Sequence, residues 1–292
     1  MKHRALLLIN THARQGENRL AEAVECLKEL GFDLIDEFPE EAQQLHEVIT
    51  RHQHEVDLVI IGGGDGTLNA AVDALVETQL PLGIIPLGTA NDLARTLEIP
   101  NSLPEACKII ANNQVRRIDL GWVNGKHFFN VASCGLSVKI TQRLTKQVKR
   151  RWGILAYAIT ALQVVLKSRP FRAEISINNT PIIVKTVQIA VGNGRYYGGG
   201  MAVVHDATID DQKLDLYSVE IKHWWQIIPL LPAMRKGRHI YSDHVRTIST
   251  QEIEIRTRKP RPINTDGEIT TYTPAQFRVI PRALAVFVPS NK

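Results

Sequence analysis

The chain has 292 residues, which is more than one domain usually holds, so two domains are expected. Its hydrophobic fraction of 44% is ordinary for a protein that builds a globular core. No run of about 18 apolar residues is present, so no membrane-spanning helix is expected, and the net charge of +5 is modest.

The charge is divided unevenly along the chain. Residues 1–120 carry 10 Lys+Arg and 19 Asp+Glu, a balance of −9, whereas residues 121–292 carry 25 and 11, a balance of +14. This change of sign predicts a boundary between one domain at 1–120 and a second at 121–292. It also marks the second half as the surface for an anionic partner, either nucleic acid or an anionic membrane.

The N-terminus and the cysteines both indicate a cytoplasmic protein. Residues 1–10 have a basic flank, but their apolar run is too short for a signal peptide and is typical of a first strand. Cys26, Cys107 and Cys134 are odd in number and far apart, without the spacing of metal ligands. They are expected to be reduced thiols.

Strands and helices alternate through the first 120 residues. This order predicts an open parallel α/β sheet covered on both faces, which binds its ligand beyond the carboxyl ends of the strands. The expected strands are Ala5–Asn10, Phe32–Ile35, Asp57–Ile61 and Leu82–Ile85, and the expected helices are Arg19–Leu30, Glu41–His52, Asp92–Leu97 and one that follows Asp65.

A glycine-rich loop, Gly62-Gly-Gly-Asp-Gly-Thr67, joins the third strand to its helix. Glycine lets the backbone turn tightly and approach a ligand, and the N-terminus of a helix attracts phosphate. Asp65 would repel a bare phosphate, so a divalent cation is expected between them. A glycine-rich turn alone is weak evidence for phosphate binding, whereas the string Gly-Gly-Asp-Gly-Thr is much more specific.

A second polar loop follows the fourth strand, in the segment Pro86-Leu-Gly-Thr-Ala-Asn-Asp92. Gly88 allows close approach, Thr89 supplies a hydroxyl, and Asn91 and Asp92 add a donor and an anion. Taken alone, these residues are best explained by simple capping of the next helix by Thr89 or Asn91. Since both loops leave strands at the same edge and should face one cleft, a shared nucleotide site is the better explanation.

From about Ile118 onwards, short alternating runs predominate and are separated by Gly, Asn, Asp and Pro turns. The pattern predicts an antiparallel β-sandwich or barrel with helical insertions at about Val138–Lys167 and Trp224–Lys236. The runs are Phe128–Ala132, Ala173–Ile177, Ile182–Val191, Leu214–Val219, Glu252–Arg256, Gln276–Ile280 and Leu284–Val288.

Both helical insertions combine basic and apolar residues. Residues 139–172 hold nine Lys/Arg and no acid, and the apolar helix Ile154–Leu166 inside them is too short to span a bilayer and suits a buried core helix as well. The basic cluster before it comprises Lys146, Lys149, Arg150 and Arg151 beside Trp152. The segment Lys222–Arg238 sets two tryptophans beside aliphatic residues and a basic tail. This composition predicts peripheral membrane contact, and no nucleic-acid-binding module is recognisable.

Two polar turns remain in the second half. Ala207–Asp215 carries three carboxylates, and Asp211 could hold a hard cation such as Mg²⁺, although a plain β-turn explains the segment equally well. Asn264-Thr-Asp-Gly-Glu268 contains Asp-Gly, a common hairpin signal, and by itself is expected to be structural.

Four motifs occur together and in order: Gly63-Gly-Asp-Gly-Thr67, Pro86–Asp92, Gly192-Asn-Gly194 with Gly198-Gly-Gly-Met201, and Asp266-Gly-Glu268. In this combination the whole chain resembles the diacylglycerol kinase catalytic-domain family, in its bacterial soluble, YegS-like lipid kinase branch. The resemblance implies an N-terminal nucleotide-binding α/β domain, a C-terminal β-sandwich domain with helical insertions, and an ATP site between them.

The resemblance also assigns residues. Glu268 would be the carboxylate base, with Asp266 as its neighbour or alternative, and Asp65 and Asp92 would act through magnesium. A structural Mg²⁺ would be held by the Asp211 side chain and by the carbonyl groups of Thr208 and Lys213. The ATP-binding residues would be Gly63, Gly64, Asp65, Gly66, Thr67, Leu68, Asn69, Thr89, Asn91 and Asp92.

The chain departs from the family pattern in several places. Gln212 stands where the family usually has glycine, which puts the Asp211 metal site in doubt, and Thr265 replaces a usual leucine. The early Asn-Pro-x-x-Gly-like element is here Asn10–Gly16, and a threonine that touches ATP is replaced near Pro39.

The function expected from these residues is ATP-dependent phosphorylation of a lipid hydroxyl at the membrane surface. The acceptor could be diacylglycerol, phosphatidylglycerol, ceramide, a sphingoid base or a lipid-linked sugar, and the resemblance makes a homodimer plausible. One alternative is NAD kinase, whose family also uses Gly-Gly-Asp-Gly-Thr. The other is a non-catalytic protein that binds nucleotide or lipid on the same fold.

Overall fold

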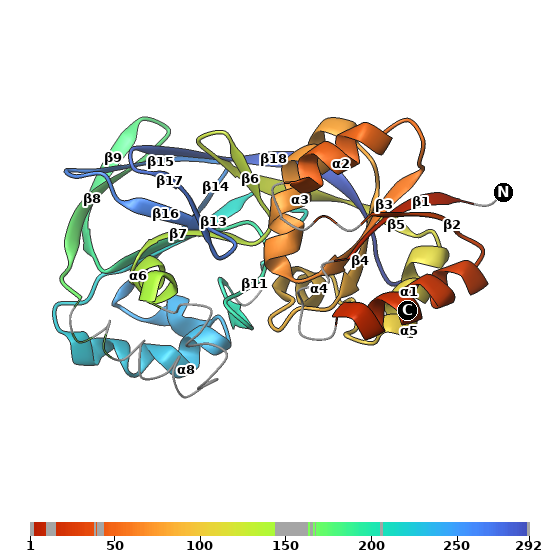
Figure 1. Cartoon of the computed structure of the whole chain (residues 1–292). Coiled ribbons are helices and arrows are strands. Elements are labelled where there is room, and N and C mark those ends of the chain that lie inside the picture. The colour runs from red at the N-terminus through yellow and green to blue at the C-terminus, as the bar shows by residue number, and fades with distance from the viewer. Residues whose placement is uncertain are drawn as a thin grey trace.

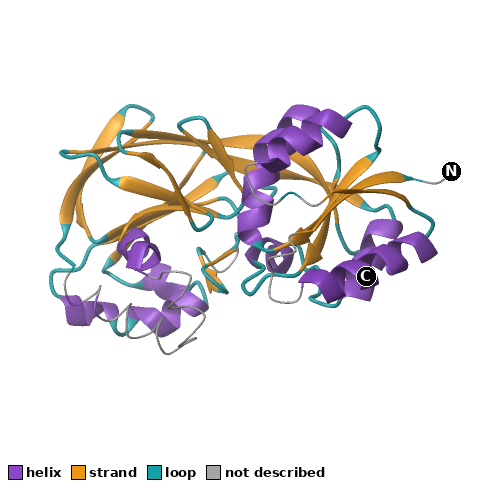
Figure 2. Ribbon diagram, in the orientation of Figure 1, coloured by secondary structure: helices purple, strands orange, loops and turns teal. Residues whose placement is uncertain are grey.

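The structure is a computed structural model, and it describes residues 3–9, 16–37, 39, 44–143, 163, 166, 168–204 and 207–290. An α/β half is followed by a half made of antiparallel sheets (Figures 1 and 2), which confirms the predicted fold class. The basic cluster Lys146–Arg151 with Trp152, most of Ile154–Leu166, and residues 10–15 lie outside the described residues. Within the described residues, no helix is long and apolar enough to cross a bilayer.

The N-terminal strands form a parallel sheet in the order β2-β1-β3-β4. Helices α2 and α3 cover one face of this sheet, and α1 and α5 cover the other. The elements are β1 (Arg4–Ile9), α1 (Gly16–Glu29), β2 (Asp33–Glu37), α2 (Gln44–His52), β3 (Leu58–Gly63), α3 (Asp65–Thr78), β4 (Leu82–Pro86), α4 (Asp92–Thr96) and α5 (Leu103–Ala111).

Strand β3 shows why its sequence is an uninterrupted apolar run. Val59 and Ile61 pack with α2 and α3, whereas Leu58 and Ile60 pack with α1 and α5. Successive side chains of a strand point to opposite faces, and here both faces are covered. The strand therefore ends in a buried position at the edge of the sheet where the glycine loop begins.

The same sheet continues into the C-terminal half in the order β4-β18-β15-β8-β9, with β5 beside β18 and β6 beside β5. Val286, near the end of the last strand, pairs in parallel with Leu82 of β4, so the end of the chain returns to the N-terminal half (Figure 1). Strand β5 runs through residue 120, and the boundary at that position stays a prediction. The strands are β5 (Val115–Val123), β6 (Lys126–Phe128), β8 (Phe171–Ile177), β9 (Thr180–Thr186), β15 (Glu252–Thr257) and β18 (Ala275–Phe287).

A second, antiparallel sheet packs against this extension and forms the sandwich core. Its other face packs against helices and a small hairpin, β11 (Tyr196–Tyr197) with β12 (Met201–Ala202). The strands, in order, are β14 (Val245–Thr250), β13 (Leu214–Val219), β10 (Gln188–Gly192), β7 (Val131–Gly135), β16 (Pro262–Thr265) and β17 (Glu268–Tyr272). The helices are α6 (Leu136–Arg143), η1 (Trp224–Ile227), α8 (Leu230–Arg235) and η2 (Arg238–Tyr241).

Two predicted strands are divided in the structure. The run Phe128–Ala132 is broken at residues 129 and 130, because these amides donate to a carboxylate and not to a neighbouring strand. The run Ile182–Val191 becomes β9 and β10, which lie in different sheets. Between them, the Thr186 hydroxyl donates to the carbonyl oxygens of Gln188 and Val219, which holds the chain as it crosses between sheets.

Two other predicted strands are joined. The runs Gln276–Ile280 and Leu284–Val288 belong to one strand, β18, whose register shifts between Ile280 and Leu284. At this bulge Arg282 has a φ of 50° and its amide donates to Asp119. The sequence alone showed only the interruption, since the partner carboxylate is distant along the chain.

Candidate active site

The two glycine-containing loops lie against each other, as predicted from their position at one edge of the sheet. The amide of Leu87 donates to the carbonyl of Gly63 at 2.9 Å. A β-carbon on Gly88 would stand 2.5 Å from the α-carbon of Gly64, which is closer than real β-carbons approach. Glycine is therefore required at Gly88 for the backbones to meet.

Asp65 joins the two loops directly. Its Oδ1 atom accepts the amide hydrogen of Leu93 at 3.1 Å, so a carboxylate from the start of α3 holds the start of α4. Asn91, the residue before α4, has a φ of 50°, and its amide group donates to the carbonyl of Gly88 and to Asn101. The capping of α4 thus comes in part from the first loop, which the sequence did not indicate.

Asp92 is nearly inaccessible to solvent, with 4% exposure. One carboxylate oxygen accepts the amide hydrogen of Gly199 at 2.9 Å, and the other is buried without a hydrogen-bond partner among the described residues. Burial raises the pKa of this carboxyl, the Gly199 amide lowers it, and the negative charge of Asp65 raises it further. A buried carboxylate oxygen without a partner is suited to a cation.

The glycine loop Gly198–Gly200 reaches α4 from the C-terminal half. Its three residues all have positive φ, and a β-carbon on Gly200 would meet the Arg95 guanidinium at 2.8 Å. This loop and Asp92 were recognised as separate motifs in the sequence, and the structure brings them into contact.

The start of α3 has the features of an anion site. Its N-cap residue is Gly64, so no side chain caps the helix. The amides of Thr67 and Leu68 donate hydrogen bonds to the Gly64 carbonyl oxygen. Thr67 and Leu68 are buried, and Leu68 packs in the core on the face of the sheet that α2 and α3 cover. Thr89, in the second loop, is exposed.

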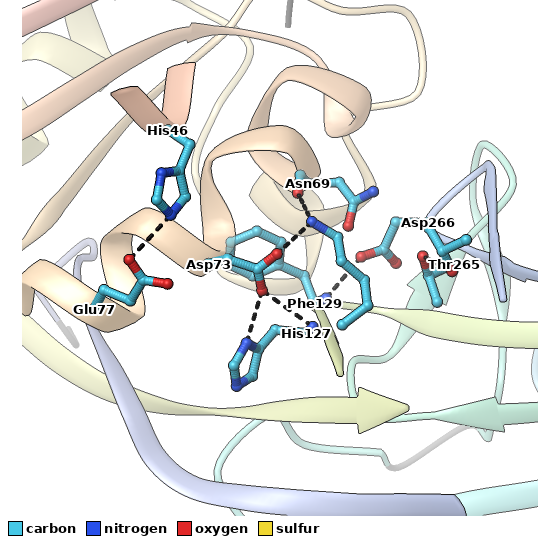
Figure 3. Close-up of polar contacts among 10 residues, drawn as sticks. His46, Asn69, Asp73, Glu77, His127, Phe129, Thr265 and Asp266 are labelled. Carbon is cyan, nitrogen blue, oxygen red and sulfur yellow. Dashed lines mark hydrogen bonds and ion pairs between the residues drawn. The ribbon is translucent and has the colours of Figure 1, made fainter. Parts of the chain in front are cut away.

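Asn69 lies one turn into α3 and is 1% exposed. Both polar atoms of its side chain are buried without a partner in the described part of the chain. Its backbone carbonyl oxygen accepts a hydrogen bond from the Lys126 ammonium group at 3.3 Å. Figure 3 shows the Asn69 amide on the side of α3 that faces Asp266. Buried amides are nearly always paired, so this one is a candidate ligand contact.

Asp266 anchors the turn between β16 and β17. It adopts a φ of 48°, and its carboxylate accepts three consecutive amide hydrogens, from Phe129 at 2.7 Å (Figure 3) and from Asn130 and Val131 at 3.0 Å each. Burial raises the pKa of Asp266 to about 6, the three amides act to lower it, and Asp65 adds to the rise. Both oxygens of this carboxylate are engaged.

Glu268, at the start of β17, is exposed, and no hydrogen bond or ion pair to another described residue holds its carboxylate. Its Oε1 atom lies 3.8 Å from the position of a β-carbon on Gly66. The hairpin therefore places an exposed acidic side chain against the first turn of α3. Thr265, which replaces the usual leucine, is buried and shares a hydrogen bond of 3.0 Å with Thr270.

Asp73 ties α3 to the C-terminal half. It pairs with the Lys126 ammonium group at 2.6 Å. It also pairs with His127 Nδ1 at 2.8 Å (Figure 3). Burial acts to raise the pKa of Asp73, but the bonds from His127 and Lys126 prevail and lower it to about 2. Sequence reasoning missed this cluster because Asp73 is more than 50 residues from Lys126 and His127, and the three residues form no motif.

Asn193, the residue after β10, links that strand to β5. Its amide group donates to the carbonyl oxygens of Asp119 at 3.0 Å and Phe129 at 2.8 Å, and its buried Oδ1 atom has no partner among the described residues. The buried Asp119 carboxylate in turn accepts the amides of Gln212 and Arg282. The string Gly192-Asn-Gly194 was the only sequence signal for this network.

The Asp211 turn is joined to this network through Asp119, which accepts the Gln212 amide hydrogen. Asp211, Thr208 and Lys213 are exposed, and Asp211 Oδ1 accepts the Lys213 amide at 3.1 Å. Gln212 has a φ of 61°, a conformation that glycine adopts without strain. Within the described residues, no cluster of three or more His, Cys, Asp or Glu side chains could hold a metal ion. A metal at this turn stays a prediction.

Comparisons with known proteins identify the family. The family described as "diacylglycerol kinase catalytic domain" matches residues 4–123, and the one described as "YegS C-terminal NAD kinase beta sandwich-like domain" matches residues 130–288. A YegS-like lipid kinase of Klebsiella pneumoniae is 32% identical over 98% of this chain and 97% of its own. A diacylglycerol kinase of Bacillus subtilis is 29% identical over 82% of this chain and 80% of its own.

A solved structure has the same fold over nearly the whole chain. The crystal structure of a diacylglycerol kinase from Bacillus anthracis superimposes with a TM-score of 0.83 at 26% identity. The superposition covers 98% of this chain and 97% of that one. The likeness therefore includes both halves of the fold and the loops between them.

Proposed function

This chain belongs to the diacylglycerol kinase catalytic-domain family of lipid kinases, and from that premise we propose that it transfers the γ-phosphoryl group of ATP to a lipid hydroxyl. The observation that carries the proposal is the position of Glu268, whose carboxylate stands beside Gly66 at the N-terminus of α3. An acidic side chain and a phosphate-binding helix end thus lie side by side, as transfer from a phosphate to a hydroxyl requires.

The phosphates of ATP would bind at the start of α3. The helix has 14 residues and a glycine N-cap, so its partial positive charge and its first amides are not screened by a capping side chain. The close packing of Gly64 on Gly88 adds the Thr89 hydroxyl of the second loop to the same edge. Asn69, buried and unpaired within the described residues, is proposed as a further polar contact.

Asp92 and Asp65 would hold magnesium. The unpaired, buried Oδ1 atom of Asp92 fits a hard cation. Burial, with a further contribution from the negative charge of Asp65, raises the pKa of Asp92. When bound, magnesium supplies positive charge that offsets the phosphates and these two carboxylates. Asp65 keeps its bond to the Leu93 amide, so it fixes the second loop at the same time.

Glu268 is proposed as the base. Its carboxylate is free to approach an acceptor hydroxyl at the first turn of α3, to orient that hydroxyl and to take its proton as the oxygen attacks phosphorus in line. Asp266 is proposed as the residue that positions Glu268, because its two oxygens already accept three backbone amides. These contacts support the assignment of different roles to Glu268 and Asp266.

The acceptor is proposed to be a lipid with a free hydroxyl, resembling diacylglycerol or phosphatidylglycerol. The support is the names of the relatives, which are lipid kinases and diacylglycerol kinases. The basic balance of residues 121–292 also suits a substrate held in an anionic membrane.

The test is transfer of labelled γ-phosphate from ATP into a total lipid extract, with and without magnesium. The control is Asp65→Asn, which keeps an oxygen for the Leu93 amide but removes the charge. A labelled lipid that needs magnesium and is lost in the variant would support the proposal and identify the acceptor. Label on NAD, when NAD is supplied instead, would assign the chain to NAD phosphorylation. Nucleotide binding without transfer to either acceptor would indicate a non-catalytic binding protein.

A further inference from the structure

An exposed apolar patch lies on the helices that cover the outer sheet of the C-terminal half. Trp225 and Ile228 are 52% and 51% exposed, and Trp224 is 40% exposed. All three come from η1 or the residue after it, and we call Trp224, Trp225 and Ile228 the tryptophan patch. Large apolar side chains gathered on a surface mark an interaction site more often than scattered ones do.

The segment that carries the patch is apolar on two sides. Ile227 and Leu230 are buried in the cluster under the outer sheet, so they already fasten the segment to the protein. A segment that faced only water would carry polar residues on its other side. Here that side presents the tryptophan patch, which leaves an apolar surface for a partner.

The tryptophan patch is held rigidly. The Gln226 side-chain oxygen accepts the amides of Lys222 and His223 at 2.8 Å each, and its nitrogen contacts His244 at 3.1 Å. The His223 ring stacks on Trp225 with 4.3 Å between ring centroids. The indole groups are therefore presented by an ordered turn, which lowers the entropy lost on binding.

The charge around the patch is positive. Between Lys222 and Arg238 the sequence has four Lys/Arg residues and no acid. These cations, Lys222, Arg235, Lys236 and Arg238, are all exposed. The acid that precedes the segment, Glu220, is paired with Arg246 at 2.7 Å. A basic rim around tryptophan and isoleucine complements an anionic lipid surface.

The patch is connected to the catalytic region. Ile227 and Leu230 share a core cluster with Tyr197 and Val203, which flank the glycine loop that contacts Asp92. Figure 1 shows the β11–β12 hairpin between α8 and α4, and α8 packs on β12. A small pocket, lined in part by Lys222, Trp224 and Leu136, opens beside the patch.

We infer that the tryptophan patch and its basic rim form the surface by which this protein docks on an anionic phospholipid membrane. The indoles and Ile228 enter the headgroup boundary, and the four cations contact lipid phosphates. The inference deepens the proposed function, on which it rests for the need to reach a lipid substrate. It concerns binding, so it can be tested without catalysis.

The test measures sedimentation of the full chain with vesicles of phosphatidylcholine that contain about one third phosphatidylglycerol. The double variant Trp225→Ser, Ile228→Ser should lower the vesicle partition constant at least about tenfold. Replacing Lys222 and Lys236 by Gln should lower it roughly 30-fold, at about 1 kcal/mol for each cation. The tryptophan emission of the wild type should also shift to the blue when vesicles are added, and that of the double variant should shift less.

Matched controls lie elsewhere on the surface. Tyr272→Ser with Ile183→Ser removes apolar residues that are more exposed than those of the patch, and Lys185→Gln with Lys259→Gln removes exposed cations. These variants should bind vesicles like the wild type. Equal losses in patch and control variants, or none in either, would overturn the inference. So would a wild-type dimer that the patch variant splits, without any binding to vesicles, because the patch would then join two copies of the chain.

Measurements of kinase activity distinguish this inference from the proposed function. With acceptor lipid dispersed in detergent, the patch variants should phosphorylate it at the wild-type rate, whereas acceptor in vesicles should be phosphorylated more slowly. Loss of turnover in detergent as well would place the patch in the substrate site and overturn the docking role. Vesicle binding by a wild type that phosphorylates no lipid would refute the proposed function and still support the docking surface.

Discussion

The Oε1 atom of Glu268 lies 3.8 Å from the place where a β-carbon on Gly66 would stand. The two residues are far apart in the chain, one in the second sheet and the other in the first turn of α3. A methyl group on Gly66 would make ordinary contact with the carboxylate but would occupy space proposed for a phosphate. We therefore predict that glycine is needed at position 66 for access of the phosphate rather than for backbone conformation.

Replacement of Gly66 by Ala should separate stability from activity. Alanine favours the helix by about 1 kcal/mol over glycine, so the melting temperature should stay level or rise. Kinase turnover should fall about 100-fold, because a displaced phosphate cannot meet Glu268 in line. Thermal unfolding and initial rates on the same samples check both parts. Full activity in a folded Gly66→Ala protein would show that this side of the helix carries no substrate.

Replacement of Glu268 by Gln should remove the base without disturbing the fold. The side chain is exposed and unpaired within the described residues, so the free energy of unfolding should change by less than about 0.5 kcal/mol. Turnover should fall about 10²–10⁴-fold. The measurement is single-turnover phosphate transfer at saturating ATP. A rate near that of the wild type would exclude Glu268 as the base.

Replacement of Asp266 by Asn should lower stability, which replacement of Glu268 by Gln should leave nearly unchanged. Asparagine tolerates the positive φ of this turn, but its amide nitrogen cannot accept a backbone hydrogen. At least one of the amides of Phe129, Asn130 and Val131 would be left unpaired, which costs about 1–3 kcal/mol. Urea unfolding should therefore show a clear loss of stability. An unfolding midpoint equal to that of Glu268→Gln would contradict the anchoring role.

His239 should make stability depend on pH. Its ring is 1% exposed and packs edge-on to Tyr217, and burial lowers its pKa to about 4. The unfolded chain, with a pKa near 6.5, takes up the proton first, so stability is complete above about pH 6.5 and is lost as the pH falls towards 4. The loss from this group is roughly 3 kcal/mol.

The variant His239→Phe keeps an aromatic ring in this position without a titrating group. Its unfolding free energy should fall less than that of the wild type between about pH 6.5 and 4. Denaturant unfolding at several pH values measures the difference. Parallel pH profiles for the two proteins would show that His239 does not titrate on unfolding.

Gln212→Gly should stabilise the Asp211 turn. Gln212 has a φ of 61°, and relief of this conformation is expected to raise the unfolding free energy by about 0.5–1 kcal/mol. If the turn holds magnesium, the gain should be larger when magnesium is present. Thermal unfolding with magnesium and with a chelator distinguishes the two cases. A lower melting temperature under both conditions would mean that the glutamine side chain makes a needed contact.

Much of this protein was predictable from local patterns. The uninterrupted apolar run Leu58–Ile61, followed by Gly-Gly-Asp-Gly-Thr, was sufficient for a buried strand that leads into a helix, because both faces of that strand are covered. The Asp-Gly hairpin was also predictable, since the turn requires positive φ at Asp266 and Gly267. The combination of motifs was enough to recognise the family.

What the sequence alone determined was the set of chemical groups and the elements that carry them. Only the tertiary structure decided which groups meet: Glu268 with Gly66, Asp266 with three amides of residues 129–131, and Asp65 with Leu93. It also decided that the last strand returns to the first sheet through Val286 and Leu82. The physical reason is that periodicity and turn propensity are local, whereas a buried carboxylate is satisfied by whatever donors the fold brings to it from distant parts of the chain.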